Sequence, residues 1–190
     1  MKSLSTIGRI LSMLTACLCQ QFRQEGMPLC VCAMRHHSDL LVADGCGECT
    51  CEDGSDGRLY ARVVEIRATD NDNRSASGAQ PCANPLVEAE FAFAVYRCIY
   101  LTDDGLAPPA DVLNWEAQQF LADAEVMRRA VMCCTLPPEL GTWWKRTTTW
   151  TPLSSGNCAG GELRAIVTGT PRMNRLITVP DPEPVKRGAW

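Results

Sequence analysis

The sequence has no excess of positive charge and no long apolar run, and each shortage argues against one class of function. Its 22 acidic residues outnumber its 18 Lys and Arg residues, which gives a formal net charge of −4. Sequence-independent binding to nucleic acid depends on a dense Lys/Arg surface, which this composition does not favour. We therefore expect no such binding, and no specific nucleic-acid partner either. No stretch reaches the ~18 consecutive apolar residues of a membrane-spanning helix, so we expect no membrane partner either.

Residue patterns that carry catalysis are also scarce. The only two histidines, His36 and His37, are adjacent, and neighbouring side chains of a strand point to opposite faces, so they cannot jointly hold one metal ion in a strand. No Gly-x-Ser-x-Gly elbow marks a nucleophile. Gly160-Gly161 is not followed by the Lys-Ser/Thr of a phosphate-binding loop. We therefore expect neither an enzyme nor a cofactor.

The apolar content is ample for one folded unit. Hydrophobic residues make up 46 % of the 190 residues, which is enough to close a single core. The end of the sequence is different, because Pro171, Pro180, Pro182 and Pro184 punctuate it. We expect one domain over residues 1–169, followed by an extended Pro-rich arm over residues 170–190 that lies on a neighbouring subunit.

Hydrophobic periodicity predicts two helices and several strands. Apolar residues recur every three or four positions in two segments, which is the spacing of one helical face. Strands are predicted where β-branched residues cluster or where apolar and polar residues alternate. The predicted helices span residues 4–24 and 110–134, and the first predicted strands span residues 29–34, 58–69 and 86–101.

Two further strands are predicted near the end of the domain. They span residues 142–151 and 162–168, and the Pro-, Ser- and Gly-rich stretch 152–161 between them is typical of a long hairpin loop. Residues 39–56 and 70–81 are predicted to be polar loops. This order of elements lacks regular β-α alternation, so it predicts an α+β fold with a mainly antiparallel sheet.

Cysteine is abundant, and its chemistry stays open at the level of sequence. The chain has twelve cysteines, and Cys46-Gly47-Glu48-Cys49-Thr50-Cys51 contains the Cys-x2-Cys spacing of a zinc knuckle. A structural zinc site needs four ligands, and no second knuckle of that spacing follows. A structural zinc site, disulfides and reduced thiols therefore remain three alternatives, and the cluster lacks the following helix of a redox-active motif.

The beginning of the sequence imitates a bacterial lipoprotein signal. Lys2 and Arg9 precede an apolar run that ends in Leu14-Thr15-Ala16-Cys17, and lipid attachment would make Cys17 the first residue of the mature protein. The apolar run covers only about seven residues, at the lower limit for such signals, so we do not expect export by this route. An extracytoplasmic Cys-rich lipoprotein that acts as a binding module remains the competing hypothesis.

Three segments together resemble a Cys-rich family encoded among the head and tail genes of actinobacterial siphophages. The resemblance extends over roughly residues 5–168 and depends on spacing and on a few Cys, Gly and Trp residues. It is carried by Cys46 to Cys51 leading into Gly57 to Val64, by the helix Leu113 to Cys134, and by Trp150 to Leu153 with Asn157 to Leu163.

The resemblance implies a structural role in the phage neck. Members of this family are taken to be head-to-tail connector or tail terminator proteins, which form a ring around the neck channel and catalyse nothing. Adaptors are mostly helical and stoppers are small β-barrels, whereas terminators combine a mainly antiparallel sheet with flanking helices. The predicted elements fit the terminator type best, with adaptor or stopper as alternatives.

The same resemblance implies partners, a location and a use for the cysteines. It predicts a homo-oligomeric ring, by analogy a hexamer, that contacts the major tail tube protein and the head-tail connector proteins. The protein would assemble in the host cytoplasm and reside in the virion, where disulfides formed after lysis would strengthen the ring. On this basis we expect bridges, without assigning pairs, at Cys46, Cys49, Cys51, Cys82, Cys133 and Cys158.

Overall fold

A computed structural model of the chain describes residues 5–35, 57–69, 86–100, 108–155 and 158–171. Within these ranges the chain forms two helices, a short 3-10 turn and five strands. In chain order they are α1 (Thr6–Gln24), β1 (Val31–Met34), β2 (Arg58–Thr69), β3 (Leu86–Cys98), α2 (Ala110–Cys133), η2 (Pro138–Leu140), β4 (Gly141–Ser155) and β5 (Cys158–Pro171).

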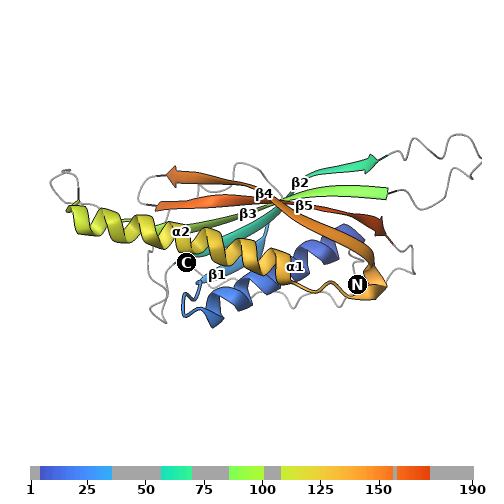
Figure 1. Cartoon of the computed structure of the whole chain (residues 1–190), viewed down its shortest axis with the longest axis horizontal. Coiled ribbons are helices and arrows are strands. Elements are labelled where there is room, and N and C mark those ends of the chain that lie inside the picture. The colour runs from blue at the N-terminus through green and yellow to red at the C-terminus, as the bar shows by residue number, and fades with distance from the viewer. Residues whose placement is uncertain (1–4, 36–56, 70–85, 101–107, 156–157, 172–190) are drawn as a thin grey trace, which may run out of the picture.

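The five strands form one sheet in the order β1-β2-β3-β5-β4, and α1 and α2 lie on the same face of it (Figure 1). All neighbouring strands are antiparallel except β1 and β2, which are parallel. The predicted α+β class with a mainly antiparallel sheet is confirmed. In the described sheet, β4 is an edge strand that is hydrogen-bonded to β5 alone.

The first helix packs one continuous stripe against the sheet. Ile10, Leu14, Leu18 and Phe22 recur every four residues and are fully buried, as the sequence periodicity predicts. The Ser5 side chain accepts a hydrogen bond from the Gly8 backbone amide at 3.1 Å, so the helix starts with an ordinary N-cap. The predicted helix over residues 4–24 is confirmed, with its first turn beginning at Thr6.

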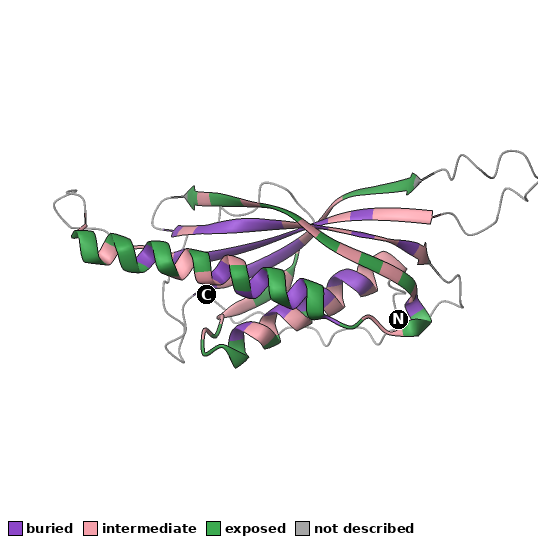
Figure 2. Ribbon diagram, in the orientation of Figure 1, coloured by how far each residue is buried: buried purple, intermediate pink, exposed green. Residues whose placement is uncertain are grey.

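The central strand β3 separates the two faces of the sheet. Phe91, Phe93 and Val95 are fully buried under the helices, whereas the alternating residues Ala92 and Ala94 point to the opposite face. Figure 2 shows the buried stripe that runs through β3 and β5 beneath the helices. We call the face that carries Ala92 and Ala94 the open face, because neither helix packs on it.

The second helix is anchored along only part of its length. Pro109 directly precedes its first turn, a position that suits proline. Its buried apolar residues all lie between Val126 and Val131, in the second half of the helix. The first half is largely exposed in Figure 2 and carries exposed Leu113 and Trp115. The helix therefore presents apolar side chains that its own domain does not cover.

The predicted loop over residues 152–161 is wrong. Residues 152–155 belong to β4 and residues 158–161 to β5, so the two strands are longer than expected. The glycines are needed for packing: a Cβ on Gly160 would lie 1.9 Å from the Val95 carbonyl oxygen, and one on Gly161 would lie 2.2 Å from the Trp150 ring. The two glycines, which are typical of loops, are therefore present in this strand because a carbonyl group and an aromatic ring approach its backbone closely.

The remaining boundaries differ by a few residues. Strand β1 begins at Val31, two residues after its predicted start, and β3 ends at Cys98 where residue 101 was expected. Strand β5 continues through Pro171, so the sheet includes the first two residues of the predicted arm. Residues 172–190 and the predicted loops 39–56 and 70–81 lie outside the described residues.

Candidate functional site

Disulfides attach α1 to two other parts of the body. Cys17 is bonded to Cys134, just after α2, and Cys19 is bonded to Cys32 in β1. Cys30, Cys98 and Cys158 are disulfide-bonded as well. The disulfide alternative therefore holds for these cysteines, and α1 is held covalently on two sides.

Cys133, which was expected in a bridge, is a free and exposed thiol, so that prediction is wrong. The reason is helical phase: Cys134 lies four residues after buried Ala130, whereas Cys133 lies four residues after exposed Arg129. Only Cys134 therefore faces α1 and its Cys17. The other predicted bridge members, Cys46, Cys49, Cys51 and Cys82, lie outside the described residues.

The bridge at Cys17 also bears on the lipoprotein hypothesis. Lipid attachment at Cys17 would use the same sulfur that is bonded to Cys134, so the two modifications exclude each other. The candidate zinc knuckle at Cys46 to Cys51 and the pair His36-His37 lie outside the described residues. Within the described ranges, no three His, Cys, Asp or Glu side chains are grouped to hold a metal ion.

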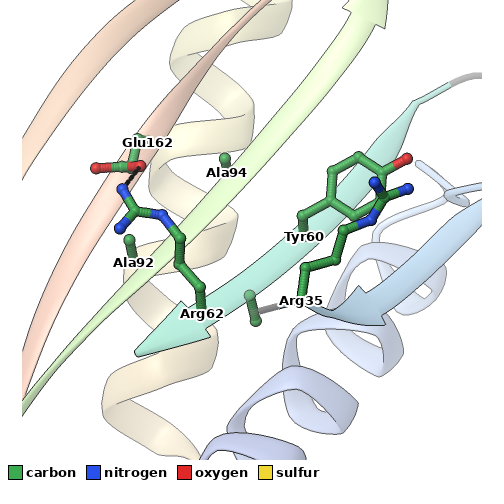
Figure 3. A pocket seen from close by; sticks show the side chains of 7 residues that line it. Arg35, Tyr60, Arg62, Ala92, Ala94 and Glu162 are labelled. Atoms are coloured by element: carbon green, nitrogen blue, oxygen red, sulfur yellow. Dashed lines mark hydrogen bonds and ion pairs between the residues drawn. The ribbon is translucent and has the colours of Figure 1, made fainter. Parts of the chain in front are cut away.

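Long charged side chains cross the centre of the open face. Arg62 of β2 and Glu162 of β5 flank Ala92 and Ala94, and their side chains meet over the middle strand at 2.9 Å (Figure 3). They can meet because alanine is short. Arg164 extends the chain of charges, with contacts of 3.0 Å to Glu162 and 3.1 Å to a carboxylate of β3. Hydrogen bonding to Glu162 raises the pKa of Arg164.

A small pocket opens beside this charge network. The Arg35 guanidinium lies 4.2 Å from the centre of the Tyr60 ring, a cation–π contact, and forms one wall (Figure 3). Arg62 and Glu162 form the opposite wall. The volume is about 10 Å³, which is room for one water molecule at most. The pocket is too small for an organic substrate, so the open face presents a filled, charge-paired surface.

An ion pair with almost no solvent exposure joins β3 to α2. Arg97 donates two hydrogen bonds to Asp123, of 2.8 and 2.9 Å, and the two side chains are 5 % and 0 % exposed. About two helical turns earlier, the Glu116 carboxylate accepts a hydrogen bond from the Tyr100 backbone amide at 2.7 Å. These contacts hold the part of α2 that precedes its buried apolar residues.

Lys145 of β4 closes the other end of α2. Its ammonium group donates to the carbonyl oxygens of Val131 at 2.8 Å and Met132 at 3.0 Å, and also to that of Cys134. These carbonyls have no partner within the helix, and a positive charge complements the helix dipole there. Burial lowers the pKa of Lys145. Because β4 starts near this end of α2, the strand and the helix run in opposite directions.

Apolar side chains are exposed along α2 and along β4. Trp115 and Leu121 of α2 are 61 % and 68 % exposed, and Trp144 of β4 is 62 % exposed. In the Trp-rich segment 143–150, Trp143 and Trp150 instead pack against the core. Exposed side chains of this size are candidates for contact with another chain.

A groove separates α2 from the middle of β4. Its volume is about 330 Å³, comparable to on the order of ten water molecules at ~30 Å³ each. Small residues create it, since the helix contributes Ala124 and the strand contributes three consecutive threonines. It is lined by Leu121, Ala124, Glu125 and Arg128 of α2, by Thr147, Thr148, Thr149 and Trp150 of β4, and by Leu163 of β5.

A bulge in β4 shapes the strand wall of this groove. Thr147 pairs with Ala165 and Trp150 pairs with Leu163, so β4 has one residue more than β5 in this interval. The Thr148 hydroxyl donates to the Arg164 carbonyl at 3.3 Å and ties the bulge back to β5. The sequence did not reveal this site, although the run of three threonines before Trp150 was a visible signal.

Comparison with known proteins gives no assignment. No protein-family model matches the chain, and no curated protein matches its sequence significantly. None of the described helices is long and apolar enough to cross a membrane.

Proposed function

We propose that the chain is a non-enzymatic structural subunit of a tailed-phage neck, a tail terminator that forms a ring of identical copies. The ring would join the tail tube to the head connector in the virion. The resemblance described above suggests this role. The α+β body with a mainly antiparallel sheet and two helices on one face is the architecture expected of the terminator type.

The observation that carries the proposal is the unpaired edge strand beside an exposed apolar helix surface. Strand β4 is 15 residues long and has no second neighbour in the described sheet. A long free edge is a template for pairing with another chain unless it is covered. Leu113, Trp115 and Trp144 are exposed on α2 and β4. Self-association through these surfaces would cover both, as a ring does.

Other features suit a ring under mechanical load. Two disulfides hold α1 to α2 and to β1, so the body resists deformation when the tail bends against the head. The net charge of −4 suits the wall of a channel that DNA must leave, because phosphate is repelled. An adaptor or stopper position in the same neck would use the same properties.

One observation favours a second candidate, an extracytoplasmic Cys-rich binding module. Seven cysteines of the described residues are disulfide-bonded, and such bridges are typical of oxidising compartments. The two candidates differ in assembly: the neck subunit must associate with itself, whereas a binding module has no such requirement.

Native mass spectrometry of the purified full chain, with and without reductant, tests the proposal. We expect a closed oligomer of defined copy number, and negative-stain images should show rings with a central opening. Substitution of exposed Trp144 with Glu should shift the population to monomers while the thermal unfolding temperature stays unchanged. A strictly monomeric chain at high concentration, or a lipidated chain beginning at Cys17, would overturn the neck role.

A further inference from the structure

We propose that the groove between α2 and β4 receives residues 175–179 of a second copy of the chain, added as a strand to the free edge of β4. This inference rests on the proposed function, because it names the contact through which neighbouring copies would join. The groove combines two properties that a strand-binding site needs, a free sheet edge and a shaped cavity next to it.

The free edge supplies the main-chain contacts. Along an edge strand, the amide and carbonyl groups of one residue point to the neighbouring strand, and those of the next residue point outward. In the described sheet, the outward groups of β4 have no strand to pair with. An extended polypeptide satisfies such groups with regular hydrogen bonds, which a globular surface or a helix cannot do. The occupant should therefore be an extended segment.

The cavity supplies side-chain selectivity. Leu121, Trp150 and Leu163 give the groove an apolar lining, and Ala124 leaves room between helix and strand. A strand laid on β4 turns every second side chain toward α2, because side chains alternate along a strand. The groove thus selects a segment that has apolar residues two positions apart.

The sequence beyond β5 contains such a segment. Ile177 and Val179 are β-branched and two positions apart, and Pro180 follows directly and ends the possible strand.

Charge sets the direction of the added strand. Because α2 and β4 run in opposite directions, Glu125 lies toward the Trp150 end of the groove and Arg128 toward the Thr147 end. A strand antiparallel to β4 places Arg175 at the Glu125 end of the groove. The parallel direction would bring Arg175 toward the like charge of Arg128.

The antiparallel direction requires a second copy. Pro171 pairs with Gly141, so the segment leaves the sheet at the start of β4. To enter its own groove antiparallel to β4, the segment would first have to run from Gly141 to beyond Trp150. This is nine residues of strand, or about 30 Å, and only the four residues from Pro171 to Arg175 are available to cover it. Four residues span at most about 14 Å. The segment of a neighbouring copy has no such restriction.

A peptide titration tests the groove independently of ring formation. A fluorescent synthetic peptide of residues 172–183 is titrated with the full chain that carries Ile177→Asp, so that its own segment does not compete. We expect saturable binding in fluorescence anisotropy, weakened about ten-fold or more by a second substitution, Leu121→Glu. Met132→Glu is the matched control, since Met132 is also an exposed apolar residue of α2 but does not line the groove. No saturable binding, or equal binding to the Leu121→Glu chain, would overturn the inference.

A mixing experiment tests whether the contact joins two copies. Chains with Ile177→Asp and chains with Leu121→Glu should each be monomeric in native mass spectrometry, and their mixture should form dimers held by one intact contact. Peptide binding with a monomeric mixture would mean that the segment docks within its own chain, and it would overturn the inference. Rings that persist in the Leu121→Glu chain would overturn the inference and leave the proposed function standing. A monomeric unsubstituted chain would count against both.

Discussion

The bridge between Cys17 and Cys134 should contribute more to stability than the bridge between Cys19 and Cys32. The first closes a chain segment with a sequence separation of 117, and the second closes one of 13. A cross-link lowers the entropy of the unfolded chain, and this effect grows with the logarithm of the closed length. The two lengths correspond to about 5 and about 3 kcal/mol. The first figure is an upper bound, because the other bridges shorten its loop in the unfolded chain.

Paired alanine substitutions test this order. The full chain with Cys17→Ala and Cys134→Ala is compared with the full chain with Cys19→Ala and Cys32→Ala, so that no unpaired partner thiol is left. Since folded domains are stable by only about 5–15 kcal/mol, we expect the first variant to be partly unfolded at 37 °C and the second to stay folded. Urea unfolding followed by tryptophan fluorescence measures both, because Trp143 and Trp150 pack against the core.

The denaturant dependence provides a second readout. Removal of a long cross-link lets the unfolded chain expand further, so the slope of unfolding free energy against urea should rise more for the first variant than for the second. The reasoning is refuted if the two variants unfold at the same urea concentration, or if loss of the shorter bridge lowers stability more. Circular dichroism before unfolding confirms that each variant starts from the native fold.

Three further predictions concern single residues. Gly161→Ala should destabilise the fold by about 1–3 kcal/mol and alter tryptophan fluorescence, because the new methyl group would overlap the Trp150 ring; an unchanged spectrum and stability would count against this packing. Arg97→Met should cost about 3–5 kcal/mol in urea unfolding, because it removes the guanidinium that pairs with the buried Asp123 carboxylate; a loss under about 1 kcal/mol would contradict the burial of the pair. Burial raises the pKa of Tyr96 to about 12, so this phenol favours folding while neutral and its contribution is lost as the pH rises from 10 to 12; an absorbance titration should show one late-titrating tyrosine that disappears in Tyr96→Phe.

Sequence periodicity was sufficient for the elements that bury one clear face. Helix α1 follows from the four-residue spacing of Ile10, Leu14, Leu18 and Phe22, and β3 follows from the alternation around Phe91. In both cases one face is apolar and the other is not, so the pattern has a single interpretation. These elements then determine the layer arrangement, since each must bury its apolar face against the other.

The cysteine assignment could have been improved from the same periodicity. Cys133 and Cys134 are adjacent, but a helix turns about 100° per residue, so only one of them can share the buried stripe of Ala130 and Val131. That residue is Cys134. Which distant cysteine it meets depends on how α1 and α2 cross, and this is a tertiary relation that no local pattern encodes.

The hairpin of β4 and β5 was mispredicted for a reason that also explains the groove. Gly160 and Gly161 resemble loop residues, yet in β5 they let the Val95 carbonyl and the Trp150 ring approach the backbone closely. The Trp150 ring can lie against β5 because Gly161, two residues from its partner Leu163, lacks a side chain, so the space between β4 and α2 is left to small threonines. A larger residue at position 161 would push the ring toward α2 and fill the groove. The same glycine that hid the strand in the sequence therefore keeps open the cavity in which a neighbouring copy would dock.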